Sequence, residues 1–140
     1  MRLELATPSR LVVSAEVDEV VVPGSEGYFG VLPGHAAFLT TLGAGELVYR
    51  QGREEHRLVV IGGFAEVSGD QVIILAERAE RPEEIDRARA ERALQRADQR
   101  LSGRPPRDAH EEIDYSRALA ARQRALARLE VAAHAATTVG

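Results

Sequence analysis

Residues 64–75 of the chain, Phe-Ala-Glu-Val-Ser-Gly-Asp-Gln-Val-Ile-Ile-Leu, place two short apolar runs on either side of Ser68-Gly69-Asp70. Serine, glycine and aspartate favour tight turns, and β-branched residues favour strands, so this segment predicts a β-hairpin. A second hairpin is predicted where Leu47-Val48-Tyr49 and residues 58–61 flank Gln51-Gly52-Arg53. Strands this short at this spacing indicate an antiparallel sandwich or a flattened barrel.

The character of the sequence changes near residue 77. Residues 1–76 contain five arginines and ten acidic residues, whereas residues 77–140 contain thirteen arginines and twelve acidic residues. The formal charge is therefore −5 in the first part and +1 in the second, and the chain contains no lysine. The second part is the one suited to meet anions.

The second part has helical periodicity. Pro82 suits the first position of a helix, and the acidic residues after it suit the positive end of a helix dipole. Residues 102–106, Ser-Gly-Arg-Pro-Pro, should end this helix. A second helix is expected from about Glu111, with residues 135–140 frayed. The apolar residues at helical spacing are Ala90, Leu94, Ala97 and Leu101 in the first helix and Ala118, Ala121, Ala125, Leu129 and Ala132 in the second. We therefore expect an antiparallel helical hairpin lying on or beside the sheet domain.

Alanine is the commonest apolar residue in the seam of this hairpin, and leucine is sparse. Alanine and arginine form helices readily, but removing one methyl group from water contributes only about 0.8 kcal/mol. The two helices are therefore expected to form easily and to pack weakly, as a rearranging element requires. A static alanine-rich hairpin is the alternative.

The arginines of the two predicted helices also follow helical spacing. A solvated stripe with acidic partners one turn away is the ordinary explanation for any single arginine. Two facing stripes would instead make a concave site whose planar guanidinium groups suit a polyphosphate. In an extended arrangement, the same stripes would face an acidic protein. The residues concerned are Arg89, Arg92, Arg96 and Arg100 in the first helix and Arg117, Arg124 and Arg128 in the second.

Several classes of function are disfavoured by composition. The net formal charge of −4 argues against nucleic-acid binding, which requires a basic surface. Without cysteine or lysine, the chain has no thiolate metal site, no phosphate-loop GxxxxGK motif and no Schiff-base lysine. Its four histidines form no zinc motif. Its apolar runs are too short to span a membrane, and charge enters at once after Met1, unlike a signal peptide. We expect no catalytic residue and no metal site.

Three motifs resemble one known family. Residues 23–36 read Pro-Gly-Ser-Glu-Gly-Tyr-Phe-Gly-Val-Leu-Pro-Gly-His-Ala, residues 62–67 read Gly-Gly-Phe-Ala-Glu-Val, and residues 85–90 read Ile-Asp-Arg-Ala-Arg-Ala. These are similar to signatures of the epsilon subunit of bacterial F-type ATP synthase. The resemblance implies an α+β fold, with a flattened antiparallel β-sandwich of about ten strands over residues 1–80 and a two-helix antiparallel hairpin over residues 81–140.

The resemblance also implies binding partners and a position within the ATP synthase complex. The family's subunit is non-catalytic and lies in the central stalk, where it binds the gamma subunit and the c subunits of the membrane rotor ring. By position, Glu26, Tyr28 and His35 match the rotor-facing loop. The C-terminal helices of the family can extend toward the alpha and beta subunits and inhibit ATP hydrolysis. The expected location is the cytoplasmic face of the bacterial cell membrane, as a peripheral protein of a complex that couples proton transport to ATP synthesis.

In some bacterial members of the family, the folded hairpin binds ATP without hydrolysing it, as a regulatory ligand rather than a required cofactor. Carboxylates of such a site accept hydrogen bonds from adenine or ribose, and arginines bind phosphate oxygens. Two other functions stay open: a purely structural coupler with static helices, and a free-standing ATP sensor that binds no rotor. The positions that match the ATP site are Glu80, Asp86, Arg89, Arg96, Arg124 and Arg128.

Overall fold

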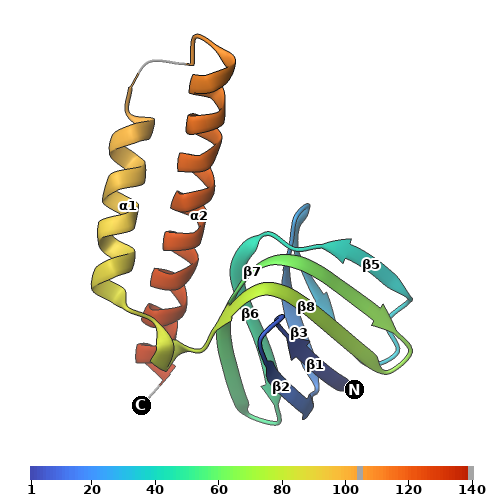
Figure 1. Ribbon diagram of the computed structural model, residues 1–140. Helices are drawn as coiled ribbons and strands as arrows, with labels where there is room; N and C mark the ends of the chain where they lie inside the picture. Colours follow the sequence, from blue (N-terminus) through green and yellow to red (C-terminus); the bar gives the residue numbers. More distant parts are fainter. Residues whose placement is uncertain (104–105, 139–140) are drawn as a thin grey trace.

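The computed structural model describes residues 1–103 and 106–138, which form a β-sheet body followed by two long helices (Figure 1). One hydrogen-bonded sheet contains all eight strands, in the order β2-β1-β8-β7-β6-β3-β4, with β5 paired to β7. The strands are β1 (Arg2–Ala6), β2 (Leu11–Glu16), β3 (Glu19–Gly24), β4 (Gly27–Val31), β5 (Phe38–Thr41), β6 (Ala44–Gln51), β7 (Glu54–Ser68) and β8 (Gln71–Glu80).

The sheet folds over on itself because β7 is long enough to serve both layers of a sandwich. Its first half pairs with β6, and its second half pairs with β5. Alternate residues of the strands point inward, so Leu3, Leu47 and Ile74 from three different strands are fully buried in one core. The predicted α+β class is confirmed, with the β-sandwich N-terminal to the helices.

The expected number of about ten strands is wrong, because β7 continues through a bend where two shorter strands were predicted. Gly62 and Gly63 make this bend with φ of +67° and +107°. A Cβ at Gly63 would lie only 1.9 Å from the carbonyl oxygen of Leu75. Strand β7 pairs with β8 both before and after the bend, so β7 remains one continuous strand. The sheet is also not wholly antiparallel, since β1 and β8 run parallel.

The first helix begins later than the sequence predicts, and the second begins earlier. Residues Pro82–Glu84 form a short 3-10 turn, η1, and α1 spans Arg87–Leu101. The carboxylate of Asp86 accepts the Arg89 N–H at 3.1 Å, which caps α1 five residues after the expected start. Helix α2 spans Ala109–Thr138, so it begins two residues before Glu111 and includes residues 135–138 of the segment expected to fray. Residues 104–105 and 139–140 lie outside the described chain.

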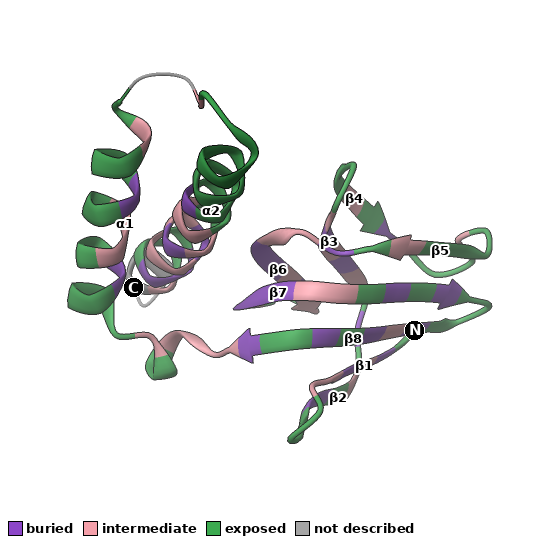
Figure 2. Cartoon of the chain, turned by 45° about the horizontal axis from the view of Figure 1, so that its top comes forward, coloured by how far each residue is buried: buried purple, intermediate pink, exposed green. Residues whose placement is uncertain are grey.

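Alanines form the seam of the hairpin, as predicted. Ala90 and Ala97 of α1 and Ala118 and Ala125 of α2 are buried, and Figure 2 shows the buried positions of α1 on the side turned toward α2. The predicted leucines of the seam are only half-buried. Over the described residues, neither helix is long and apolar enough to cross a membrane.

Helix α2 attaches the hairpin to the sandwich through a small apolar contact. Ala127 and Val131 pack against Val59 and Ile61 on the outward face of β7. Two polar contacts flank this cluster. The guanidinium of Arg128 binds both carboxylate oxygens of Glu80, with Nε at 3.1 and 2.9 Å.

The second polar contact involves Glu46, the one charged side chain that is buried among the described residues, at 9% exposure. One carboxylate oxygen lies 2.7 Å from Nδ1 of His134 in α2, and the other accepts a hydrogen bond from Arg57 of β7 at 3.0 Å. A buried carboxylate requires such partners, because an unpaired charge is costly to remove from water. The Glu46 carboxylate therefore joins the last turns of α2 to β6 and β7.

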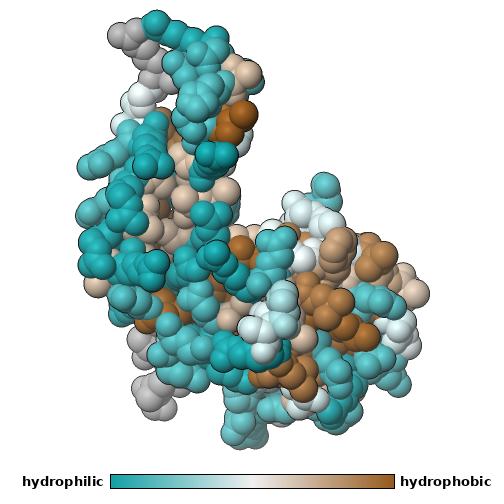
Figure 3. Space-filling view, viewed as in Figure 1, coloured by the Kyte–Doolittle hydropathy of each residue, from teal (hydrophilic) through white to brown (hydrophobic). Residues whose placement is uncertain are grey.

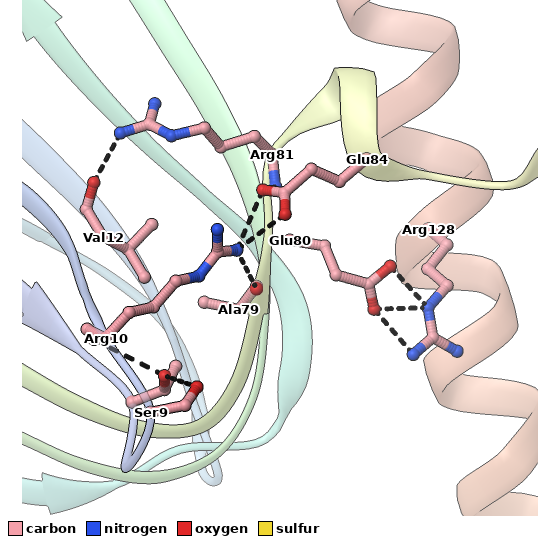
Figure 4. A network of polar contacts seen from close by, with 9 residues as sticks. Ser9, Arg10, Val12, Ala79, Glu80, Arg81, Glu84 and Arg128 are labelled. Carbon is pink, nitrogen blue, oxygen red and sulfur yellow. Dashed lines mark hydrogen bonds and ion pairs between the residues drawn. The ribbon is translucent and has the colours of Figure 1, made fainter.

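The linker between sandwich and hairpin is tied to the start of β2 (Figure 4). Arg10 donates to both carboxylate oxygens of Glu84, at 2.9 and 2.8 Å, and Arg81 donates to the carbonyl of Val12. The backbone N–H of Arg81 also binds the Glu84 carboxylate at 3.0 Å. This backbone hydrogen bond lowers the pKa of Glu84, partial burial opposes it, and the hydrogen bond and charge of Arg10 lower the pKa further.

The bend in β7 predicts a large effect for Gly63→Ala. The new methyl group would collide with the Leu75 carbonyl in a backbone conformation that L-residues rarely adopt, so we expect a loss of about 3 kcal/mol in the free energy of unfolding. Gly69→Ala is the matched control, because Gly69 has φ of +58° with open space around it, and it should cost about 1 kcal/mol. Urea unfolding measures both. Equal losses would contradict the steric role of the bend.

The Glu84 contacts predict a specific pH dependence of stability. The folded-state pKa of Glu84 lies below its unfolded value, so the stabilisation is present above the unfolded pKa and is lost as the pH falls through the folded pKa. Glu84→Gln should therefore be less stable than the parent near neutral pH and lose less stability on acidification. Glu83→Gln is the control, since Glu83 has no hydrogen bond or ion pair within the described chain. Parallel pH profiles of urea unfolding for Glu84→Gln and the parent would contradict this.

Candidate functional site

A cavity of about 480 Å³ lies between the end of β8 and the two helices. Strand β8 supplies its floor through the outward side chains of Arg78 and Glu80, and α1 and α2 supply its walls. A volume of this size is in the range of small-molecule sites. Small alanine side chains on the facing helices leave this space open. The lining residues are Arg78, Glu80, Glu84, Asp86, Arg89, Ala90, Ala93, Arg96, Ala121, Arg124 and Arg128.

All six residues that the sequence assigned to ATP line this one cavity. They come from three elements and the linker: Glu80 from β8, Asp86 from the cap of α1, Arg89 and Arg96 from α1, and Arg124 and Arg128 from α2. The structure therefore brings these six residues together around one cavity.

Sequence reasoning missed two charged residues of the cavity, Arg78 and Glu84. The signal for Arg78 was present, because residues two apart on a strand share a face and Glu80 was already assigned. Glu84 carried no comparable signal, since its position depends on the 3-10 turn of η1.

The cavity has an excess of positive charge. Each of its three carboxylates is already engaged: Glu80 binds Arg128, Glu84 binds Arg10, and Asp86 caps α1. In contrast, four of its five arginines form no ion pair within residues 1–103 and 106–138. Guanidinium groups with free donors suit phosphate oxygens, which they bind in a bidentate manner. The four arginines are Arg78, Arg89, Arg96 and Arg124.

A larger cavity of about 720 Å³ lies at the far end of the hairpin. It contains two arginines, Arg100 and Arg107, and two acidic residues, Glu111 and Asp114. Among the described residues that line it, the charges therefore balance, and none of the residues predicted for ATP is among them. The smaller cavity is the better candidate for an anion.

The three predicted rotor contacts lie between β3 and β5. Glu26 is exposed in the β3–β4 turn, and Tyr28 at the start of β4 is 58% exposed. The Tyr28 hydroxyl accepts the backbone N–H of Glu46 at 3.1 Å, so the ring lies over Gly45 and its orientation is set. His35 is half-buried, with Nδ1 2.7 Å from the Ala36 carbonyl oxygen.

A row of apolar side chains crosses the outer face of the sandwich. The pairing register places Phe64 of β7 opposite Leu75 of β8, Leu75 opposite Ala6 of β1, and Ala6 opposite Leu11 of β2. Phe64, Leu75 and Leu11 are 55%, 55% and 60% exposed. Figure 3 shows hydrophobic side chains gathered on this part of the sandwich. Contiguous exposed apolar residues of this kind mark protein interaction surfaces.

Two family models match consecutive parts of the chain. The first, "ATP synthase, Delta/Epsilon chain, beta-sandwich domain", matches residues 1–82. The second, "ATP synthase, Delta/Epsilon chain, long alpha-helix domain", matches residues 83–133.

Among solved structures, a chain of the Euglena gracilis mitochondrial ATP synthase, OSCP/F1/c-ring in rotational state 1, is 28% identical with a TM-score of 0.74. The match covers 91% of this chain and 79% of that chain. A chain of the Tetrahymena thermophila mitochondrial ATP synthase central stalk/c-ring is 16% identical with a TM-score of 0.60, covering 94% and 95%, and shows a similar fold.

Bacterial relatives have higher identity. The "ATP synthase epsilon chain 2" of Syntrophotalea carbinolica is 50% identical over 108 residues, which are 77% of this chain and 78% of the relative. The "ATP synthase epsilon chain" of Nitratidesulfovibrio vulgaris is 52% identical over 102 residues, 73% of this chain and 76% of the relative. The chain therefore belongs to the ATP synthase delta/epsilon family, as an epsilon subunit of the bacterial type and a non-catalytic part of that complex.

Proposed function

We propose that the sandwich couples the gamma subunit of the central stalk to the c subunits of the rotor ring. The exposed row of Phe64, Leu75 and Leu11 supports a protein partner on the outer face of the sheet, and we assign this face to gamma. The segment that contains Glu26, Tyr28 and His35 is assigned to the rotor ring. Through these contacts the protein is peripheral to the membrane, on the cytoplasmic face of a bacterial cell.

The helical hairpin is the regulatory part of this proposal. Its apolar contact with the sandwich has four buried side chains, of which Ala127 and Val131 belong to α2 and Val59 and Ile61 to β7, and the half-buried Ala44 and Ile85 pack against them. The sandwich has its own separate and much larger buried core. The hairpin can therefore leave the sandwich at modest cost while the sandwich stays folded. When extended, it would meet the alpha and beta subunits and inhibit ATP hydrolysis.

Bound ATP would favour the docked hairpin. The observation that carries this assignment is that one cavity contains three engaged carboxylates and four arginines that form no ion pair with any described residue. A ligand that binds only the docked form stabilises it by RT ln(1 + [L]/Kd), about 2.7 kcal/mol at a hundredfold excess over Kd. That energy is comparable to the contribution of a few buried side chains. ATP serves here as a regulatory ligand, and the protein requires no cofactor.

A static structural coupler is the second candidate, and the buried Glu46 carboxylate favours it. Separating α2 from the sandwich would remove His134 from Glu46 and leave Arg57 as the partner. Breaking one contact of a buried charge is costly. The two candidates differ in whether the hairpin affects ATP hydrolysis.

Removal of residues 81–140, after Glu80, distinguishes these candidates. The truncated sandwich should still co-purify with gamma, because it keeps its own core and its outer face. The complex that contains it should hydrolyse ATP faster than the complex with the full chain, since the inhibitory helices are gone. Equal ATPase rates would support the static coupler. A full-length chain that fails to co-purify with gamma would instead support a free-standing ATP sensor.

Arginine substitutions test the nucleotide site. Arg89→Ala and Arg124→Ala each remove a charge-assisted hydrogen-bond donor worth roughly 1.5–3 kcal/mol, so each should weaken ATP binding by about tenfold or more. Calorimetric titration of the full chain measures the affinity. Arg53→Ala is the control, because Arg53 is exposed in the β6–β7 turn and does not line the cavity. If both cavity variants bind ATP like the parent, this cavity is not the site.

A further inference from the structure

Arg78 is the one arginine of the cavity that the sandwich itself contributes. It lies on β8 opposite Ile61 of β7, and Glu80 lies opposite Val59. Directly paired residues of neighbouring strands place their side chains on the same face, and Ile61 and Val59 are the residues that α2 covers. Arg78 is therefore on the face of the sheet that meets the hairpin, at the edge of the covered area, where its side chain is exposed.

No contact within the described chain accounts for the guanidinium of Arg78. It makes no hydrogen bond and no ion pair there, although Glu80 lies only two residues away. The Glu80 carboxylate is instead bound by Arg128, through Nε and through a second nitrogen 2.7 Å from Oε2 (Figure 4). Glu84, the other glutamate that lines the cavity, is bound by Arg10 and by the Arg81 N–H.

The unpaired arginines of the cavity repel one another. Arg78 comes from β8, Arg89 and Arg96 come from α1, and Arg124 comes from α2. Bringing these like charges into one cavity of about 480 Å³ opposes the docking of the hairpin. A multivalent anion would reverse this effect, because it replaces repulsion by charge-assisted hydrogen bonds to each guanidinium.

We propose that Arg78 binds a phosphate group of the nucleotide in this cavity, so that the ligand ties the last strand of the sandwich to both helices. This inference rests on the nucleotide site proposed above and adds a contact from outside the hairpin. With Arg78 included, the anion is held from three separate elements. When the hairpin leaves, Arg78 stays behind on β8, and the site loses part of its binding energy.

Calorimetric titration of the full chain with ATP, at about 0.15 M salt to screen distant charges, tests this contact. Arg78→Ala should weaken ATP binding by about tenfold, in line with one lost charge-assisted hydrogen bond. Arg78→Lys should fall between the parent and Arg78→Ala, because lysine keeps the charge and loses the planar pair of donors. Circular dichroism verifies that each variant is folded, which is expected since Arg78 is exposed and unpaired.

Two further variants distinguish a failure of the Arg78 contact from a failure of the nucleotide site. Arg53→Ala removes the same charge from the sandwich outside the cavity and should bind like the parent. Arg124→Ala reports on the nucleotide site itself. Parent-like binding by Arg78→Ala together with weak binding by Arg124→Ala would overturn the role of Arg78 alone. Equal losses in Arg78→Ala and Arg53→Ala would also overturn it, because the effect would then be one of net charge. A parent chain that does not bind ATP would overturn both.

Discussion

The packing of α2 on the outward face of β7 positions every other feature of the hairpin. Ala127 and Val131 meet Val59 and Ile61 there, and this contact brings Arg128 to Glu80 and His134 to Glu46. Helix α1 then lies on the far side of α2 (Figure 1). The cavity exists because this docking holds the first turns of α1 and the middle of α2 beside the end of β8. Its charged residues lie around one cavity in this docked arrangement.

Interactions of opposite sign act on this contact. Small apolar side chains and two polar ties favour docking, whereas gathering four unpaired arginines beside β8 disfavours it. In the proposed function, a bound anion would reverse the second effect, and a ligand contribution of a few kcal/mol would then decide whether the hairpin is docked. Alanine and valine, rather than a large leucine core, make up the helix side of the contact.

Features that depend on neighbouring residues were predictable. The turns at residues 51–53 and 68–70, the stop after Leu101 and the alanine seam all appear in the structure. The strand count was wrong, because a pair of glycines can end a strand or bend it, and only the continued pairing of β7 with β8 distinguishes the two. The start of α1 was also displaced, because Pro82 suits a 3-10 turn as well as a helix and Asp86 provides a stronger cap.

The sequence by itself determined the family, the β-then-α order and six of the charged residues of the cavity, because motifs, turn residues and helical spacing are local properties. Only the tertiary structure decided that these six residues meet, that Arg78 and Glu84 join them, and that Arg10 reaches across from the start of β2. The physical reason is that charge balance depends on distances between residues far apart in the chain. Spacing shows which arginines share a helix face, but only the fold shows which of them have no carboxylate partner among the described residues.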